Sequence, residues 1–179
     1  EGGIIAEQSE IGPYVYMLEA VDGISGLEGF AEGVFTVQDI SSVLCVEAAG
    51  LKETDVAMDI WAAPGGKTML AAEMCSKVYA RDLSEKKVDL IVENIERMGL
   101  SDKVETEIWD ATVTDEAKTE CADVVFMDVP CSGLGVMGKK RDIKYHVTEE
   151  SLESLAELQR QIVESSWQYV KKGGVLMYS

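Results

Sequence analysis

A chain of 179 residues is one domain's worth of sequence, and its 46% hydrophobic and 27% charged residues are ordinary for a soluble globular protein. No apolar run reaches the roughly 18 residues that a membrane span needs, and no signal peptide opens the sequence, so we expect a cytoplasmic protein without membrane contact. A net charge of −17 argues against a general nucleic-acid binder, which normally carries a basic face.

The four cysteines lack the paired short spacings of a zinc site, and no metal site is expected. Without a secretory signal, reduced thiols are favoured over a disulfide framework. Cys45 and Cys75 fall in apolar helical patterns, which predicts that both are buried in the core. Cys131 differs from them because of its neighbours, which are considered below.

Residues 1–35 are rich in glycine and acidic side chains, which indicates a lead-in segment, a loop or hairpin, without a core of its own. Residues 36–179 are predicted to form a single domain. Gln38 and Asp39 lead into a helix through Ile40, Val43 and Leu44.

Strand and helix patterns alternate from residue 56 onward. The predicted strands are Val56–Ala62, Lys77–Leu83, Val104–Trp109, Asp123–Val129 and Val175–Ser179. The predicted helices are Lys67–Cys75, a helix capped by Ser84 and ended by Gly99, and Thr148–Val170, ended by Gly173-Gly174. In the last helix, the side chains expected to face the core are Leu152, Leu155, Leu158 and Ile162.

Five strands joined by helical crossovers predict an α/β fold, a doubly wound parallel sheet covered on both faces. Ligands of such sheets bind beyond the carboxyl ends of the strands, where the strand order switches direction. The residues at those ends are therefore the candidates for function.

A glycine-containing turn, Ala62 to Thr68 (AAPGGKT), follows the first of these strands. Glycines let a backbone approach a ligand closely and open the N-terminus of the next helix toward it. A phosphate-binding P-loop would need a glycine five residues before Gly66, where Trp61 stands. The dinucleotide fingerprint also fails, because its third glycine is missing.

Aspartates stand at the ends of three consecutive strands: Asp82, Asp110 and Asp128. Any one of them could be an ordinary turn or cap residue, but the set is poorly explained in that way. Asp82 is placed to accept hydrogen bonds from both hydroxyls of a ribose, and Asp110 lies near where an adenine edge would be. An anionic rim suits a ligand with a sulfonium and an ammonium group, and suits a dinucleotide phosphate badly.

Asp59 to Thr68 (DIWAAPGGKT) and Asp128 to Gly135 (DVPCSGLG), with Gly33 to Asp39 (GVFTVQD) before them, closely resemble the Sun/Fmu (RsmB-type) family of RNA cytosine-C5 methyltransferases. The resemblance implies a class I methyltransferase fold, Rossmann-like, that stops after its fifth strand in this chain. It also implies S-adenosyl-L-methionine as cofactor. The pocket residues that it implies are Trp61, Ala62, Ala63, Pro64, Gly65, Gly66, Lys67, Asp82, Asp110 and Asp128. In the family, Trp61 is usually a cysteine and Arg141 is commonly a proline.

The resemblance further implies methylation of cytosine C5 in RNA, most often ribosomal RNA, through a covalent adduct between a cysteine and ring atom C6. The family's nucleophile lies in a Thr-Cys pair directly after the fifth strand, and this sequence ends at Ser179, where that pair would begin. We therefore expect this chain alone to be inactive. Cys131 and Asp128 remain the expected catalytic groups, with Cys131 assisting release of the product.

A basic cluster follows the second motif: Lys139, Lys140, Arg141 and Lys144. It could be a solvated loop, but its position after the catalytic segment favours contact with the RNA backbone. Two other readings stay open. One is a DNA cytosine-C5 methyltransferase with Cys131 as nucleophile, against which the turn at Ala62 to Lys67 speaks. The other is a cofactor-binding module without turnover.

Overall fold

The structure is a computed structural model that describes residues 5–19, 23–24, 26–133 and 147–179 of the chain. Its strands are β1 (Ile5–Gln8), β2 (Tyr16–Glu19), β3 (Val56–Asp59), β4 (Lys77–Asp82), β5 (Val104–Ile108), β6 (Ala122–Met127) and β7 (Val170–Tyr178). Its α-helices are α1 (Ile40–Ala48), α2 (Gly66–Met74), α3 (Glu85–Arg97) and α4 (Glu149–Ser166), and its 3-10 helices are η1 (Glu116–Lys118) and η4 (Trp167–Tyr169). None of the described helices is long and apolar enough to cross a membrane.

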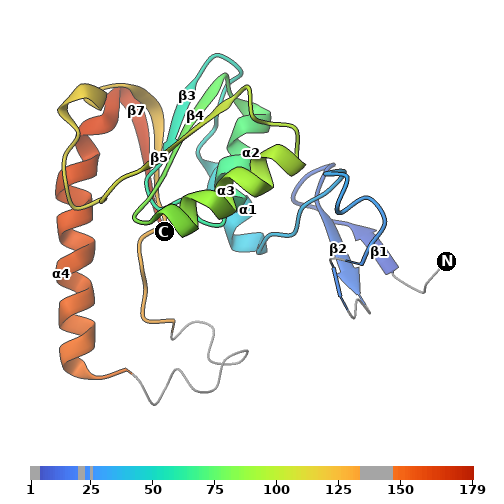
Figure 1. Ribbon diagram of the computed structural model, residues 1–179, viewed down its shortest axis with the longest axis horizontal. Coiled ribbons are helices and arrows are strands. Elements are labelled where there is room, and N and C mark those ends of the chain that lie inside the picture. The colour runs from blue at the N-terminus through green and yellow to red at the C-terminus, as the bar shows by residue number, and fades with distance from the viewer. Residues whose placement is uncertain (1–4, 20–22, 25, 134–146) are drawn as a thin grey trace.

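Five strands form one parallel sheet in the order β5-β4-β3-β6-β7. Helices α1, α2 and α3 cover one face, and α4 with η4 covers the other (Figure 1). Neighbouring residues of β3 show this alternation, since Ala57 packs in the core under α2 and α3 and Met58 packs in the core under α4. The predicted doubly wound sheet is confirmed.

Helix α3 follows its predicted pattern closely. Ser84 is the N-cap, and Gly99 ends the helix with a φ of 70°, a left-handed conformation that glycine adopts without strain. The helix buries one face, through Val88, Ile91 and Ile95. Full burial of a Val or Ile side chain contributes roughly 1.5–3 kcal/mol.

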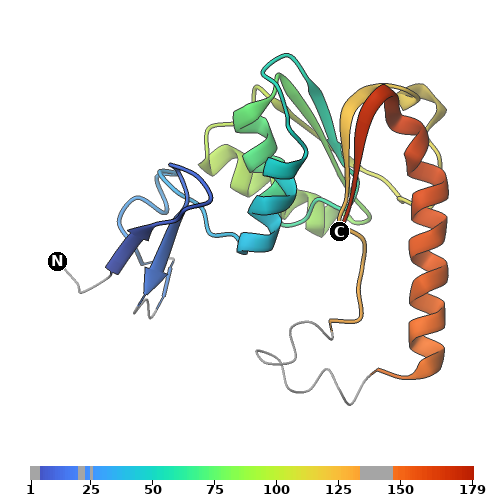
Figure 2. The same cartoon turned by 180° about the vertical axis from the view of Figure 1, so that it is seen from behind.

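Helix α4 begins where predicted, with Thr148 as its N-cap, but differs from the prediction at its C-terminal end and in its buried face. It ends at Ser166 rather than Val170, and of the four predicted inward residues only Ile162 is fully buried. Leu152 is 40% exposed, because the N-terminal half of α4 extends past the sheet (Figure 2). An 18-residue helix is about 27 Å long, whereas the six residues of β6 span only roughly 20 Å.

The prediction that Gly173 and Gly174 end a helix is wrong, because both residues lie inside β7. The pairing of β7 with β6 shifts register between Ala122 and Val124, and Gly173 at this irregularity has a φ of 82°. A Cβ on Gly174 would lie 2.6 Å from the carbonyl oxygen of Asp123, so only glycine allows the two strands to approach. The glycine pair thus allows the β-bulge in β7 to form.

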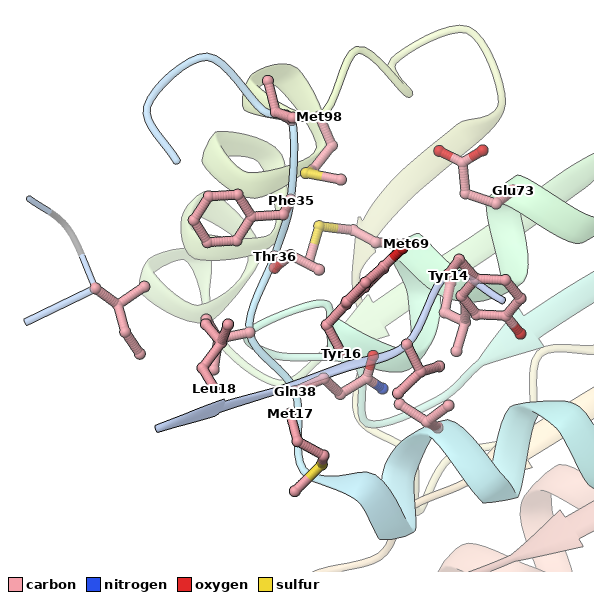
Figure 3. Close-up of a pocket in the computed structure, with 16 residues that line it drawn as sticks. Tyr14, Tyr16, Met17, Leu18, Phe35, Thr36, Gln38, Met69, Glu73 and Met98 are labelled. Carbon is pink, nitrogen blue, oxygen red and sulfur yellow. The ribbon is translucent and has the colours of Figure 1, made fainter. Parts of the chain in front are cut away.

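The N-terminal strands β1 and β2 pair as an antiparallel hairpin beside the helices of the α1–α3 face. Between this hairpin and the domain lies an apolar pocket of about 450 Å³. Tyr16 of β2 and Met69 of α2 point into it, and the stretch from Phe35 to Gln38 runs along its wall (Figure 3). The lead-in therefore packs against the domain, and the stretch from Phe35 to Gln38 connects it to α1.

Candidate active site

The carboxyl ends of the strands meet at one edge of the sheet, and the strand order switches direction between β3 and β6. Asp59 ends β3, Asp82 ends β4, and Asp128 follows β6 directly. The sequence-predicted acids Asp82 and Asp128 thus flank the switch point from two sides. Asp59, between them, was not among the predicted site residues.

The turn after β3 is shaped by its glycines. Gly65, the N-cap of α2, has a φ of 103°, which strains any residue with a side chain. Its amide donates to the carbonyl oxygen of Ala62 at 2.6 Å, which closes the turn. The first turn of α2 carries no acidic side chain of its own, and its amide groups and positive dipole end lie at the strand-end edge.

Asp82 is fully buried and holds the turn in place. Its Oδ2 accepts from the backbone amide of Ala63 at 3.0 Å, and its Oδ1 accepts from the amide of Leu83 at 2.8 Å. Lys87 makes an ion pair with Oδ1 at 2.9 Å. An ionised carboxylate has about four acceptor positions, so these three donors leave room for a further one.

Lys87 also contacts Trp61, the residue that precedes the turn. Its ammonium lies 4.5 Å from the centre of the Trp61 ring, a distance at which cation–π attraction is effective. Trp61, which stands where the resembled family usually has cysteine, therefore forms a half-buried wall beside Asp82. No pattern in the sequence singled out Lys87, because a lysine in the first turn of a helix usually faces solvent.

Asp59 lies beneath the turn, and only 1% of its surface is exposed. Burial raises its pKa to about 6, although the hydrogen bond from Thr68 and the positive charge of Lys67 oppose that rise. Oδ2 accepts from the Thr68 hydroxyl at 2.8 Å. Oδ1 is buried and has no hydrogen-bond partner within the described parts of the chain.

Lys67 and Asp128 form an ion pair at 2.5 Å across the switch point. Lys67 is buried and also donates to the hydroxyl of Ser42 in α1 at 3.2 Å. The other oxygen of Asp128 accepts from the hydroxyl of Ser179 at 3.1 Å. The side chain of Asp128 is 46% exposed, so its carboxylate is fixed by protein donors yet open to a ligand. No pattern in the sequence pointed to Ser42.

Cys131 is exposed, three residues beyond Asp128. Gln159 of α4 donates to the carbonyl oxygen of Pro130 at 2.8 Å and accepts from the hydroxyl of Tyr178 at 3.1 Å. The segment that carries Cys131 is thereby tied to α4 and β7. Cys45, predicted as a buried core thiol, is only partly buried and lies 3.9 Å from the Ser179 hydroxyl, whereas Cys75 is buried as predicted.

Asp110 lies in the exposed loop after β5. Its Oδ1 accepts from the amide and the hydroxyl of Thr112 at 2.9 and 2.7 Å. The amide of Trp109 donates to the carbonyl oxygen of Asp82 at 3.0 Å, which brings this loop beside the end of β4. Asp110 is thus the most open of the three predicted carboxylates.

A buried arginine, absent from the predicted set, supports the same loop. Arg81 is 1% exposed and pairs with Glu107 and Asp115 at 2.6 and 2.5 Å. Its guanidinium also lies 4.8 Å from the centre of the Trp109 ring. The loop between β5 and η1 is therefore fixed at both of its ends.

The structure brings the predicted turn, Asp82 and Asp128 together at one edge. The four predicted RNA contacts, Lys139, Lys140, Arg141 and Lys144, lie outside the described residues. In the described ranges, no cluster of three or more His, Cys, Asp or Glu side chains could hold a metal ion.

Comparison with known proteins gives consistent matches. Residues 47–179 match the family described as 16S rRNA methyltransferase RsmB/F. Ribosomal RNA small subunit methyltransferase B of Photorhabdus laumondii is 33% identical over 100% of this chain, which covers 42% of that protein. The chain thus spans less than half the length of this curated relative.

Solved structures match over most of the chain as well. The crystal structure of NSun6 from Pyrococcus horikoshii with SFG is 30% identical with a TM-score of 0.73, over 88% of this chain and 41% of that one. A methyltransferase homolog protein from Pyrococcus horikoshii is 25% identical with a TM-score of 0.81, over 97% of this chain and 55% of that one.

Proposed function

The chain belongs to the RsmB/F family of 16S rRNA methyltransferases, and we propose that it carries the cofactor site and part of the catalytic site of an S-adenosylmethionine-dependent enzyme that methylates cytosine C5 in RNA. Ribosomal RNA is the proposed substrate, and the cytoplasm the proposed location. The observation that carries the proposal is the joining of the turn, Asp82 and the Lys67–Asp128 pair at the switch point of the sheet.

The residues present fit the cofactor. Asp82 retains acceptor capacity for ribose hydroxyls, and the unpartnered, buried Oδ1 of Asp59 would be satisfied by an ammonium group. The glycine turn and Trp61 would line the rest of the site, and Asp110 would face the adenine. When bound, S-adenosylmethionine supplies an electrophilic methyl group on a sulfonium. Acidic strand ends favour such a cationic ligand.

Asp128 is the proposed contact to the substrate base. Cytosine presents its exocyclic amino group as a donor, and a carboxylate is the side chain that accepts from it. The ion pair with Lys67 holds Asp128 in position while leaving its side chain 46% exposed. A base held in an RNA duplex would have to be flipped out to reach this group, at a cost of a few kcal/mol.

Cytosine C5 is a weak nucleophile, and a thiolate that adds at C6 turns the ring into an enamine that can attack a methyl group. A base must then remove the C5 proton so that the thiolate can leave. By resemblance to the family, Cys131 assists this release, while the attacking thiolate belongs to a Thr-Cys pair after the fifth strand. Formation of product should therefore require the segment that carries this Thr-Cys pair, whereas binding of the cofactor should not.

The test compares this polypeptide with a version extended at Ser179 by a Thr-Cys segment from a relative. Both are incubated with labelled S-adenosylmethionine and 16S rRNA transcripts, and the labelled position is mapped. The proposal predicts label at cytosine C5 with the extended chain only. Label on another base or on ribose would overturn the cytosine assignment.

The same experiment separates the roles of the two cysteines. In the extended chain, Cys131→Ala should stall release and leave a covalent protein–RNA complex visible on a denaturing gel. Replacement of the added cysteine should abolish both complex and product. Label transferred by the unextended chain, and lost on Cys131→Ala, would instead show that Cys131 is the nucleophile.

A further inference from the structure

One face of α3 supports both the proposed cofactor turn and the lead-in to the domain. Ile91, Asn94 and Arg97 follow one another at intervals of three, so they are neighbours on the helix surface. Ile91 lies beneath the turn, where a Cβ on Gly65 would be 3.5 Å from its side chain. None of these residues belongs to the set predicted from the sequence.

Asn94 makes a direct bond to the turn. Its amide Nδ2 donates to the carbonyl oxygen of Pro64 at 3.0 Å and to that of Leu90 at 3.1 Å. Its Oδ1 accepts from the Arg97 guanidinium at 3.2 Å, so both ends of the amide are used. The side chain therefore has a fixed orientation, with its donor directed at the turn.

Arg97 binds the lead-in on the other side. Its Nη1 donates to the carbonyl oxygens of Phe30 and Phe35 at 2.8 and 3.1 Å, and its guanidinium lies 4.3 Å from the centre of the Phe30 ring. Gly33 makes this approach possible, since a Cβ there would lie 1.8 Å from the Arg97 carbonyl oxygen. The planar guanidinium presents several donors at fixed angles, which lysine cannot reproduce.

The segment that follows the lead-in approaches the cofactor turn from the side opposite to Asn94. It continues through Thr36 to Gln38, whose side chain would be 3.5 Å from a Cβ placed on Gly66 (Figure 3 shows Gln38 beside α2). The turn is thus held by the hydrogen bond from Asn94 at Pro64, whereas Gln38 only packs beside Gly66, since its buried Nε2 makes no hydrogen bond within the described residues. Arg97 therefore links the two segments, since it donates to Asn94 and to the carbonyl oxygen of Phe35 in the segment that continues to Gln38.

We propose that Asn94 is a positioning residue for the cofactor turn and that Arg97 couples the position of this turn to the lead-in segment. This inference rests on the proposed function, because the turn must bind S-adenosylmethionine for its position to matter. A ligand held by backbone groups loses affinity when those groups lose a fixed position.

The test measures the dissociation constant of S-adenosylmethionine by calorimetry and the stability of each variant by urea unfolding. Asn94→Asp keeps an acceptor for Arg97 but replaces the donor to Pro64 with an oxygen. We expect it to weaken cofactor binding about tenfold at a temperature where the protein is fully folded. Glu93→Gln, on the exposed side of the same helix turn, is the control and should bind as the wild type does.

Arg97→Lys should weaken binding by a smaller factor, about threefold, and the double variant Asn94→Asp/Arg97→Lys should bind no more weakly than Asn94→Asp alone. Additive losses would overturn the coupling. If Asn94→Asp does not fold, Asn94→Ala takes its place, because it removes the same donor without adding a charge. The loss of cofactor affinity in Asn94→Ala is then the deciding measurement.

Cofactor binding that is unchanged in a folded, less stable Asn94 variant would show a purely structural role and overturn the inference. Absence of binding by the wild type would instead refute the proposed function. The two failures are therefore distinguishable.

Discussion

The buried carboxyl group of Asp59 makes stability depend on pH in a direction opposite to that of most carboxylates. Burial raises its pKa to about 6, against 3.8 for an unperturbed group. Between these values the folded state holds a proton that the unfolded state has lost. The free energy of unfolding therefore falls as the pH rises from about 4 to about 6, and the whole loss is present above pH 6.

The size of the effect follows from the two pKa values. Their difference corresponds to roughly 3 kcal/mol between pH 4 and pH 7. The asparagine side chain introduced by Asp59→Asn resembles the protonated acid in shape, can still accept from Thr68, and does not titrate. In Asp59→Asn this loss should be absent, so the variant should gain about 3 kcal/mol relative to the wild type as the pH rises through this window.

The assay is urea unfolding of both proteins at pH values from 4 to 7.5, compared at each pH so that the other carboxyl groups cancel. Asp89→Asn, at an exposed position on α3, controls for the loss of one negative charge. A difference in unfolding free energy between wild type and Asp59→Asn that stays constant across the window would show that the Asp59 carboxyl group does not titrate in this range. A difference that changes with the opposite sign would mean that Asp59 is stabilised as a carboxylate.

Two further substitutions test the supports of the site. Gly65→Ala should cost about 1–2 kcal/mol of unfolding free energy, because a φ of 103° strains alanine while its Cβ meets only ordinary contacts; equal stability would contradict this. Arg81→Met should cost roughly 3 kcal/mol, because it leaves Asp115 and Glu107 unpaired, and Arg81→Met/Asp115→Asn should recover part of that loss. A loss below about 0.5 kcal/mol in thermal unfolding would show that water satisfies both carboxylates.

The sheet was predictable because β6 is a near-continuous apolar run and β5 alternates apolar with polar residues, and both patterns are typical of strands. The predictions for α4 and for the glycine pair failed because each sequence pattern is compatible with two different structures. A leucine every three or four residues predicts a helix, but cannot tell that Leu152 lies beyond the end of the sheet. A glycine pair suits a helix end and a β-bulge equally, and only the approach of Asp123 decides that Gly174 serves the bulge.

The candidate site divides in the same way. The turn and Asp82 could be found because strand ends meet at one edge whatever the details of packing. Lys87 and Asn94 escaped notice because they reach the turn from a helix face, and charged or amide residues on a helix usually face solvent. Arg81 precedes Asp82 in the sequence and is buried only because two acids lie opposite it.

Whether these strand ends bind S-adenosylmethionine can be measured by calorimetry of the folded 179-residue chain with the cofactor. We expect saturable binding at one site, weakened at least a hundredfold in Asp82→Ala, since hydrogen bonds to a charged group contribute roughly 1.5–3 kcal/mol each. No heat of binding at millimolar cofactor from a protein shown to be folded, or equal binding by Asp82→Ala, would contradict it.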